Sequence, residues 1–475
     1  MTKNLRSLLL ATTALSFFVL TPAHAGDATA DAIKSLQAQV NALQKQLTVM
    51  QKAKAEAPVA APAAATEAKK EILPGVSVKL GGYVAMEGVY RDRSQDGDIS
   101  TNYNTITLGH TAASNRGEFR GSARQTRLSL LAEGKASPNM NLGAYVESDF
   151  LGTNGAYSKT NSHMPRLRQA FGTVDLSDWG LHVLAGQAWS LATSSKAGIS
   201  PRGEDLPLVI DGGMLPGVVY TRNAQLRIVK DFADNNVHVA LSAESPDAVG
   251  HTAPSNVTTS SGYAPDLIGK VSYDNATFGH YEAFGMSRFF TSTLKNQTIA
   301  YQNDNEVGYG VGVSAYVPLI AKKLELHANF MTGKGIGRYG VVAMPDFSYT
   351  ANGQIKLIEQ MIGMVGLIGH PTPTLDAYLY VGAEKAMRQN NVNGYGVGVS
   401  NANCYALAPT TACAGVTESV WTIAPGIWNT VYKGDYGNLK VGAQYSLSRR
   451  DAFSDTKQPH AFENIGLVSF RYAPF

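Results

Sequence analysis

From about residue 76 onward, apolar and polar side chains alternate along the chain with a period of two. In the segment VKLGGYVAMEGVY, Leu80, Val84 and Met86 share one parity, whereas Lys79 and Glu87 share the other. The segments NLGAYVESDF (141–150) and EVGYGVGVSAYV (306–317) repeat this alternation. Strict alternation over about ten residues is typical of β-strands with one apolar face and one polar or small face. The pattern therefore predicts an all-β region from residue 76 to residue 475.

The connections between the predicted strands alternate in length. Short turns are expected near residues 133–139, 176–180, 231–236, 274–279, 318–323, 370–374 and 435–438. Longer polar segments are expected near residues 91–121, 151–165, 191–217, 246–265, 292–305, 333–355, 387–417 and 450–462. Seven short and eight long connections join sixteen strands. Tight turns at one end and long loops at the other are typical of outer-membrane barrels, and closure of the ring removes edges that lipid cannot satisfy.

The width of such a barrel decides which parity faces inward. Sixteen strands enclose a lumen that side chains cannot fill, and barrels of this size leave an aqueous channel. The apolar parity must then face lipid, and the charged parity must face water inside. The predicted fold class is thus a 16-stranded antiparallel transmembrane β-barrel that forms a pore, closed by the final segment FENIGLVSFRYAPF.

The first 25 residues read as a signal peptide. Lys3 and Arg6 precede an apolar stretch from residue 8 to residue 20, and Ala23-His24-Ala25 supplies a cleavage site. The competing interpretation is an uncleaved anchor, but the apolar stretch is shorter than the ~18–20 residues that span a bilayer. Export is therefore expected.

Residues 26–56 carry a different period. Apolar residues recur at spacings of three and four, which predicts a coiled-coil helix that self-associates or docks on another surface. Its seam consists of Ile33, Leu36, Val40, Leu43, Leu47 and Met50. The alternative is a solvated amphipathic tail, and the seam does not distinguish a dimer from a trimer. Residues 57–75 are rich in Ala and Pro and read as an extended linker.

Composition narrows the function classes. Charged residues make up 16% of the chain, and the net charge of +3 suggests no nucleic-acid partner. The chain contains no H-E-x-x-H or G-x-S-x-G motif, so neither an enzyme nor a cofactor is expected. The ten histidines are scattered, no metal site is expected, and His182, His238 and His327 read as residues of the barrel wall. Cys404 and Cys413 lie in one long loop and are expected to form a disulfide in an exported protein.

Charged residues of the polar parity are the candidates for the pore lining. Arg166 and Arg168 share one parity beside the strand that bears Glu147 and Asp149. A ladder of permanently charged guanidinium groups favours the passage of anions. The competing hypothesis is that arginines and carboxylates neutralise one another across the wall. The full set of candidates is Lys79, Arg124, Arg127, Glu147, Asp149, Arg166, Arg168 and Arg227.

Several motifs, taken in order, resemble one family. After the signal, the coiled coil and the spacer come LGGYVAMEGVY, RQTRLSLLAEG, YVESDF, RLRQAFGTV and LAGQAW. This order is similar to that of the DcaP-type trimeric porins of the Gram-negative outer membrane, most strongly over residues 76–230. The resemblance implies a homotrimer, a periplasmic N-terminal helix and passive uptake of small, often anionic solutes such as dicarboxylates.

The resemblance also singles out the third long loop. In porins this loop commonly folds inward as a constriction, which makes Arg202, Glu204, Asp205 and Asp211 candidate residues of the narrowest part. The alternative is that the loop forms an external lid.

Three functions therefore stand open. The first is an outer-membrane channel for small hydrophilic, anionic solutes, with lipid, other copies of the chain and peptidoglycan as candidate partners. The second is a non-selective or sugar-preferring porin. The third is a structural or surface-display barrel that the coiled coil tethers to the cell wall.

Overall fold

The structure is a computed structural model. It describes residues 71–73, 75–152, 161–259, 262–295, 301–389, 395, 401–405, 415–455 and 457–474. The predicted signal peptide, the heptad seam, Cys413 and Phe475 lie outside the described residues, so those assignments stay predictions. The last part of the predicted linker forms a short strand, β1 (Glu71–Leu73), which pairs with the start of β2.

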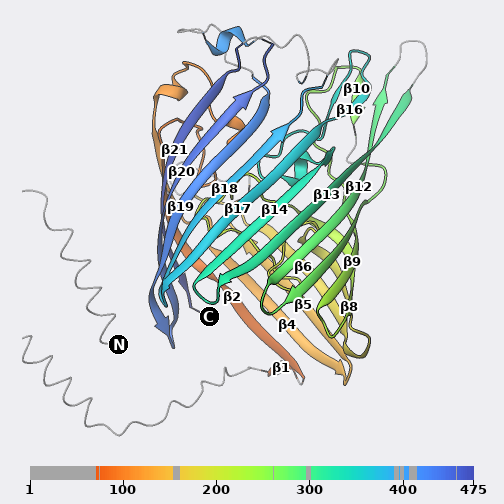
Figure 1. The fold of residues 1–475 in the computed structure, drawn as a ribbon, viewed down its shortest axis with the longest axis vertical. Coiled ribbons are helices and arrows are strands. Elements are labelled where there is room, and N and C mark those ends of the chain that lie inside the picture. The colour runs from red at the N-terminus through yellow and green to blue at the C-terminus, as the bar shows by residue number, and fades with distance from the viewer. Residues whose placement is uncertain are drawn as a thin grey trace, which may run out of the picture. The chain divides into compact units, whose positions relative to one another are not determined.

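Sixteen long antiparallel strands in the described part of the chain form a closed ring (Figure 1). Each strand pairs with the next along the chain, and the last strand pairs with the first through contacts such as Val84 with Tyr472. The sixteen are β2 (Val76–Arg91), β4 (Arg127–Ser137), β5 (Met140–Asp149), β6 (Arg166–Leu176), β7 (Leu181–Trp189), β8 (Arg222–Phe232), β9 (Val237–Glu244), β11 (Asp266–Asn275), β12 (Gly279–Leu294), β13 (Gln302–Ile320), β14 (Leu324–Lys334), β17 (Glu359–Thr372), β18 (Leu375–Ala386), β19 (Thr417–Gly434), β20 (Gly437–Ala452) and β21 (His460–Ala473). The predicted fold class is confirmed.

The alternation of short and long connections is also confirmed. All seven predicted short turns join neighbouring strands through two to four residues, and they lie at the lower end of the barrel in Figure 1. The long loops lie at the other end. One boundary was wrong, because β12 and β13 pair out to Leu294 and Gln302 and leave a shorter loop than the predicted 292–305.

The long loops contain short elements of their own. These are β3 (Glu118–Ser122), which pairs with β2, β10 (Val257–Thr259), which pairs with β12, and the hairpin of β15 (Phe347–Tyr349) and β16 (Ile355–Leu357). The 3-10 helices are η1 (Tyr103–Thr105), η2 (Ala113–Asn115), η4 (Gly337–Tyr339) and η5 (Ala402–Cys404) in the loops, and η3 (Ser177–Trp179) in a short turn. Among the described residues, no helix is long and apolar enough to cross a membrane.

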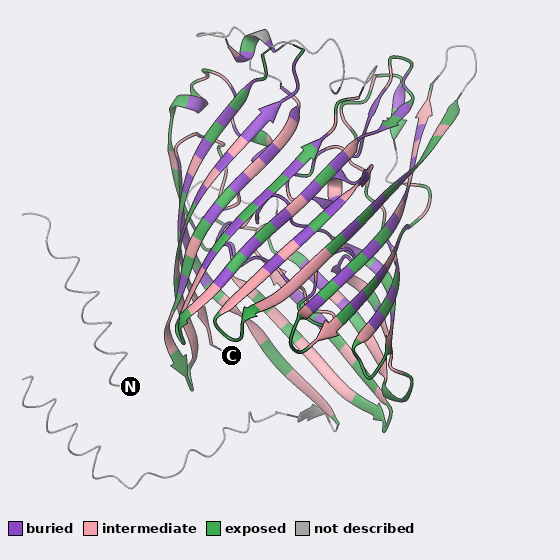
Figure 2. Cartoon of the chain, in the orientation of Figure 1, coloured by how far each residue is buried: buried purple, intermediate pink, exposed green. Residues whose placement is uncertain are grey.

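Apolar side chains of one parity cover the outside of the barrel. On β13, Val307, Tyr309, Val311 and Val313 are each more than half exposed, whereas the residues between them are buried or partly buried (Figure 2). The same alternation holds on β2 and β5. An exposed apolar surface of this extent is stable in contact with hydrocarbon, so the predicted outward parity is confirmed.

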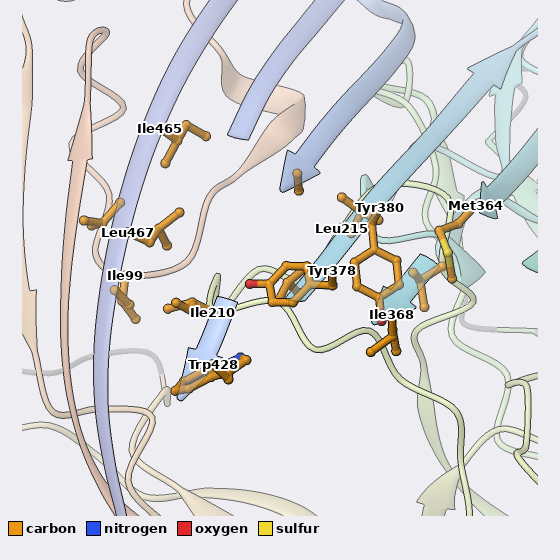
Figure 3. Packing of buried hydrophobic residues seen from close by; sticks show 14 residues of the cluster. Ile99, Ile210, Leu215, Met364, Ile368, Tyr378, Tyr380, Trp428, Ile465 and Leu467 are labelled. Atoms are coloured by element: carbon orange, nitrogen blue, oxygen red, sulfur yellow. The ribbon is translucent and has the colours of Figure 1, made fainter. Parts of the chain in front are cut away.

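The inner face is less polar than the sequence suggested. Tyr378, Tyr380, Met364, Ile368 and Trp428 point inward from β17, β18 and β19 and are buried. They pack against apolar residues of the loop between β7 and β8, among them Ile210 and Leu215 (Figure 3). A hydrophobic core therefore lies inside the barrel, between the wall and an inward-folded loop.

Candidate functional site

The loop of residues 190–221, between β7 and β8, lies inside the barrel; we call it the inner loop. The amide of Leu208 donates a hydrogen bond to the hydroxyl of Tyr380 (3.2 Å), and Trp428 donates to the carbonyl of Leu208 (2.7 Å). The amide of Ile210 donates to Gln444 on β20 (2.6 Å). The loop is thus attached to the wall opposite its own strands, as the resemblance implied, and does not cover the mouth as a lid.

Glycines allow the loop to approach the wall closely. A Cβ atom on Gly382 of β18 would lie 1.8 Å from the carbonyl oxygen of Pro216. Gly217 has φ +91°, and a Cβ there would lie 2.0 Å from the carbonyl oxygen of Gly363. No larger residue fits at these contacts, so both glycines set the depth at which the loop is seated.

The tip of the inner loop presents a cation to the wall formed by β4 and β5. Arg202 is exposed, with φ of 68°, a left-handed conformation that is uncommon outside glycine. Its guanidinium lies 3.9 Å from Glu133 on β4 and 5.3 Å from the centre of the Tyr145 ring on β5. Glu133 also lies 3.8 Å from the Lys79 ammonium.

The three acidic candidates of the loop, Glu204, Asp205 and Asp211, have surroundings different from those of Arg202. Asp205 is buried, and its carboxylate lies 2.7 Å from Nδ1 of His327 on β14. Asp211 is buried and accepts hydrogen bonds from the amide and hydroxyl of Thr101 and from the Gly213 amide, while burial raises the pKa of its carboxyl. Desolvation likewise raises the pKa of Glu204. Asp205 and Asp211 therefore hold the loop in place, and Arg202 faces open water.

The structure brings Arg127, Arg166 and Arg168 together with Glu147 and Asp149. Arg166 makes two hydrogen bonds to the Asp149 carboxylate (2.9 and 2.6 Å). Arg168 bonds to Glu147 (2.5 Å) and to Asp149 (2.9 Å), and Arg127 lies 3.7 Å from Glu147. Arg168 is buried, whereas the side chains of Arg166 and Arg127 are 34% and 29% exposed, so these two remain accessible from the lumen.

A β-bulge creates this arrangement. In the register of β5 with β6, Glu147 pairs with Gln169 and Ser148 pairs with Leu167, which leaves Arg168 as the extra residue. The bulge changes the parity of β6, because Arg166 and Arg168 point inward before it and Phe171 points inward after it. The extra residue is therefore aimed at the two carboxylates.

Two predicted lining residues, Arg124 and Arg227, bond to partners other than Glu147 and Asp149. Arg124 is buried, forms an ion pair with Asp98 (2.6 Å) and donates to the carbonyl of Phe150 (2.8 Å). Arg227 is buried and donates to Gln225 (3.0 Å) and to the Trp189 carbonyl. Arg124 thus holds the loop that precedes β4, and Arg227 bonds within the wall.

Sequence reasoning missed Arg471 on the closing strand. Its guanidinium donates to Glu87 on β2 (2.6 and 3.0 Å) and lies over the rings of Trp428 and Tyr83. Arg127 lies over the same Tyr83 ring, 5.4 Å from its centre. The signal was present in the alternation of SFRYA, where Ser469 and Arg471 share the inward parity.

These residues form one connected group, which we call the charged cluster. It joins the tip of the inner loop to the inner faces of β2, β4, β5, β6 and β21. Among the described residues it contains six cations and four carboxylates: Lys79, Arg127, Arg166, Arg168, Arg202 and Arg471, with Glu87, Glu133, Glu147 and Asp149. The cluster carries more positive than negative groups, and it can attract anions without holding them in a closed site.

The remaining candidate is the disulfide. Cys404 is disulfide-bonded, and its expected partner Cys413 lies outside the described residues. The described residues contain no group of three or more His, Cys, Asp or Glu side chains arranged to hold a metal ion.

A closed ring of sixteen antiparallel strands, with an apolar exterior and a loop folded into the lumen, defines the fold of an outer-membrane porin. The chain is similar to the solved structure of the outer membrane channel DcaP of Acinetobacter baumannii, with a TM-score of 0.65 and 20% sequence identity. The match covers 84% of this chain and 98% of that one, and at this identity it establishes the fold.

More distant likenesses have lower scores. An anion-selective porin from Comamonas acidovorans has a TM-score of 0.47 at 11% identity, and covers 84% of this chain and 99% of its own. The trimer form of OmpT from Vibrio cholerae has a TM-score of 0.48 at 11% identity, with the same coverage. No protein-family model and no curated protein matches the chain.

Proposed function

We propose that the chain is an outer-membrane channel through which small hydrophilic anions, such as dicarboxylates, diffuse passively. The observation that carries this proposal is the position of Arg202, which extends from the inner loop toward a wall that already bears more cations than carboxylates. A dicarboxylate that passes this point meets several guanidinium groups gathered on one part of the wall, those of Arg202, Arg127 and Arg166. Arginine binds carboxylates through paired hydrogen bonds, and the exposed surroundings keep each contact weak enough for release.

The degree of selectivity follows from the pairing within the charged cluster. Arg168 is buried between Glu147 and Asp149, so its charge is offset by these carboxylates and does not act on the solute. This supports part of the alternative hypothesis of a neutralised wall. The preference for anions then depends on Arg202, Arg166, Arg127 and Lys79, whose side chains contact water. We expect a moderate anion preference and not an exclusion of cations.

The proposal extends to assembly and location. The outward apolar face supports insertion into the outer-membrane bilayer. The heptad seam of residues 26–56 supports self-association of the N-terminal helices in the periplasm, the resemblance to trimeric porins favours a homotrimer, and peptidoglycan is a further candidate partner.

Conductance through a planar bilayer tests the proposal. The purified full chain should give single-channel currents, and a potassium chloride gradient should give a reversal potential of the sign expected for chloride preference. The double substitution Arg166→Ala with Arg202→Ala should move the reversal potential toward that of a neutral pore. Lys295→Ala, an exposed cation at the end of β12, is the matched control and should change nothing. A barrel without conductance would instead support a structural or display function, and a reversal potential near zero for the unmodified chain would support a non-selective porin. An unchanged reversal potential in the double variant would overturn the role of Arg166 and Arg202.

A further inference from the structure

Five of the ten histidines lie at the short-turn end of the barrel, and each places both ring nitrogens near carboxylates. In the first series of contacts, His182 lies between Asp175 (2.7 Å) and Asp231 (2.8 Å). His238 lies between Asp231 (2.6 Å) and Asp274 (3.0 Å). We call the group of Asp175, His182, Asp231, His238, Asp274, His280 and Glu282 the histidine belt.

The belt continues along the wall beyond Asp274. His280 lies 2.8 Å from Asp274 and 3.2 Å from Glu282, and Lys270 lies 3.1 Å from Glu282. A second, shorter series of contacts contains His327 between Asp205 and Glu325, and His370 between Glu325 and Asp376. The two series of contacts together reach from β6 to β18 and include the inner loop through Asp205.

The belt arises from a motif repeated in three successive hairpins. Asp175 pairs across strands with His182, Asp231 with His238, and Asp274 with His280. Each of these residues is the second residue from the end of its strand, next to a short turn. Because the hairpins have this common register, neighbouring hairpins bring the histidine of one beside the aspartate of the next. The repetition makes the belt a property of the fold and not of one local contact.

The hydrogen bonds fix the charge that the belt needs. An ionised carboxylate can only accept hydrogen bonds, and a neutral imidazole donates from one nitrogen alone. His182 and His238 therefore keep both of their bonds only as imidazolium ions. With its histidines protonated, the belt has three imidazolium ions and Lys270 against four carboxylates, so it is balanced. When the histidines lose their protons, the four carboxylates keep Lys270 as their one remaining counter-charge within this group.

Other groups also face the belt. Arg227 of β8 and Asp175, His182, Asp231 and His238 line a cavity of about 190 Å³ beneath residues 198–201 of the inner loop. The Gly198 amide donates to Asp274 (2.9 Å), and Glu204 of the same loop interacts with Arg227 and Lys270. Glu244 of β9 interacts with Arg227 as well. Arg227 and Lys270 are the cations among these groups, and Glu204 and Glu244 are the carboxylates, so the set supplies no surplus of positive charge to replace the lost cations.

The belt is in contact with solvent at its Asp175–His182 end. The side chains of His182 and Asp175 are 37% and 39% exposed, whereas His238 is 9% exposed. A change in the charge of His182 is thus felt by ions that pass the short-turn end of the lumen, within a screening length of about 10 Å at moderate salt.

We infer that the histidine belt determines the ion selectivity of the short-turn end of the channel, and that its deprotonation shifts this selectivity toward cations. The inference rests on the proposed channel function and adds a second selectivity element to the charged cluster. At low pH the belt is neutral and the cluster's preference for anions prevails. At high pH the belt is negative and opposes the entry of anions.

Reversal potentials measured from about pH 5 to about pH 9 at low salt test the inference, since this range covers the titration of imidazole. For the unmodified full chain, the chloride-to-potassium permeability ratio should fall by roughly threefold across the range, because three cations are lost from one wall. His182→Gln with His238→Gln should remove most of this dependence, because glutamine keeps an N–H donor and does not titrate, and only His280 remains in the belt. His110→Gln, an exposed histidine of the loop that follows β2, is the matched control and should keep the full dependence.

The outcomes separate the two proposals. An unmodified chain that inserts but does not conduct would overturn the channel function. An unmodified chain that conducts with the same selectivity at all pH values would overturn the role of the belt alone, whatever the variants do. The belt assignment also fails if the double variant keeps the full pH dependence. His182→Gln alone, at a partly exposed position, provides the same test if the double variant does not fold, and should remove part of the dependence.

Discussion

The guanidinium of Arg168 lies 2.5 Å from the carboxylate of Glu147 on the neighbouring strand, at the point where β6 has one residue more than β5. The contact exists because of the extra residue. Arg168 is buried there and reaches Asp149 as well, so it offsets part of the negative charge of two buried carboxylates. The pair stabilises the wall, whereas the more exposed arginines around it, Arg127 and Arg166, remain accessible from the lumen.

Loss of Arg168 should destabilise the barrel. Arg168→Ala leaves the buried carboxylates Glu147 and Asp149 with fewer counter-charges, and removing one partner of a buried ion pair costs about 3–5 kcal/mol. Urea unfolding of the refolded protein in detergent measures this loss. Arg166→Ala, at a position that is one-third exposed, is the control and should cost much less. Equal losses for the two variants would show that burial does not distinguish their roles.

Arg202 should affect transport more than stability. Arg202→Ala and Arg202→Gly both remove the cation at the loop tip, and both should lower the anion preference in bilayer recordings. They differ in the backbone, because glycine adopts the observed φ of 68° without strain. We therefore expect Arg202→Gly to be more stable than Arg202→Ala by roughly 0.5–1 kcal/mol. Equal anion preference in the unmodified chain and both variants would exclude Arg202 from the permeation path.

The seating of the inner loop should depend on Gly382. Gly382→Ala places a methyl group 1.8 Å from the Pro216 carbonyl oxygen, so the loop must move away from β18. We expect altered single-channel conductance with more current noise, because the loop loses part of its attachment. Gly285→Ala on the outward face of β12 is the matched control, since a Cβ there meets nothing within 4 Å. A Gly382→Ala channel with unchanged conductance and noise would show that the loop does not narrow the lumen.

Asp211 should respond to pH in a direction opposite to that of a typical surface carboxylate. Burial raises its pKa, so the folded state binds the proton more tightly than the unfolded state. The stability from this carboxyl is then present at low pH and is lost as pH rises through the raised pKa. Asp211→Asn, which stays uncharged, should equal the unmodified protein near pH 4 and exceed its stability near pH 7.

The alanine variant separates charge from hydrogen bonding at this position. Asp211→Ala removes the acceptor of the Thr101 and Gly213 amides, which should cost about 1–3 kcal/mol at both pH values. Urea unfolding of the three proteins at the two pH values gives the comparison. If Asp211→Asn is less stable than the unmodified protein near pH 7, attraction to the nearby Arg91 outweighs the cost of burial.

The sequence predicted the barrel well because lipid and water impose one rule on every strand. Outward residues such as Val307 and Val311 had to alternate with small or polar residues, and the breaks in this alternation marked the short turns. The contacts that each arginine makes were harder to predict from the sequence. Arg124, Arg166 and Arg168 look alike in sequence, but the contacts of each depend on loop paths and on a bulge that no local pattern reveals.

Two other features, the inward tyrosines and the paired histidines, were visible in the sequence but could be explained only once their partners in the fold were known. Tyr378 and Tyr380 lie on the parity of Glu384, so the alternation marks them as inward, and only the loop packed against them explains why aromatic rings are there. The histidines looked scattered because their partners lie across turns. The recurrence of an aspartate six or seven residues before His182, His238 and His280 is legible once the turns are placed.

The ring is completed by the pairing of β21 with β2, where Arg471 meets Glu87. These two segments stand at opposite ends of the barrel's polypeptide, so no product of interrupted synthesis can reach the sealed state. Without β21, β2 and β20 would both display unpaired backbone donors and acceptors, which lipid cannot satisfy. Truncation before β21 should therefore deprive the barrel of a stable place in lipid, because the ring would stay open.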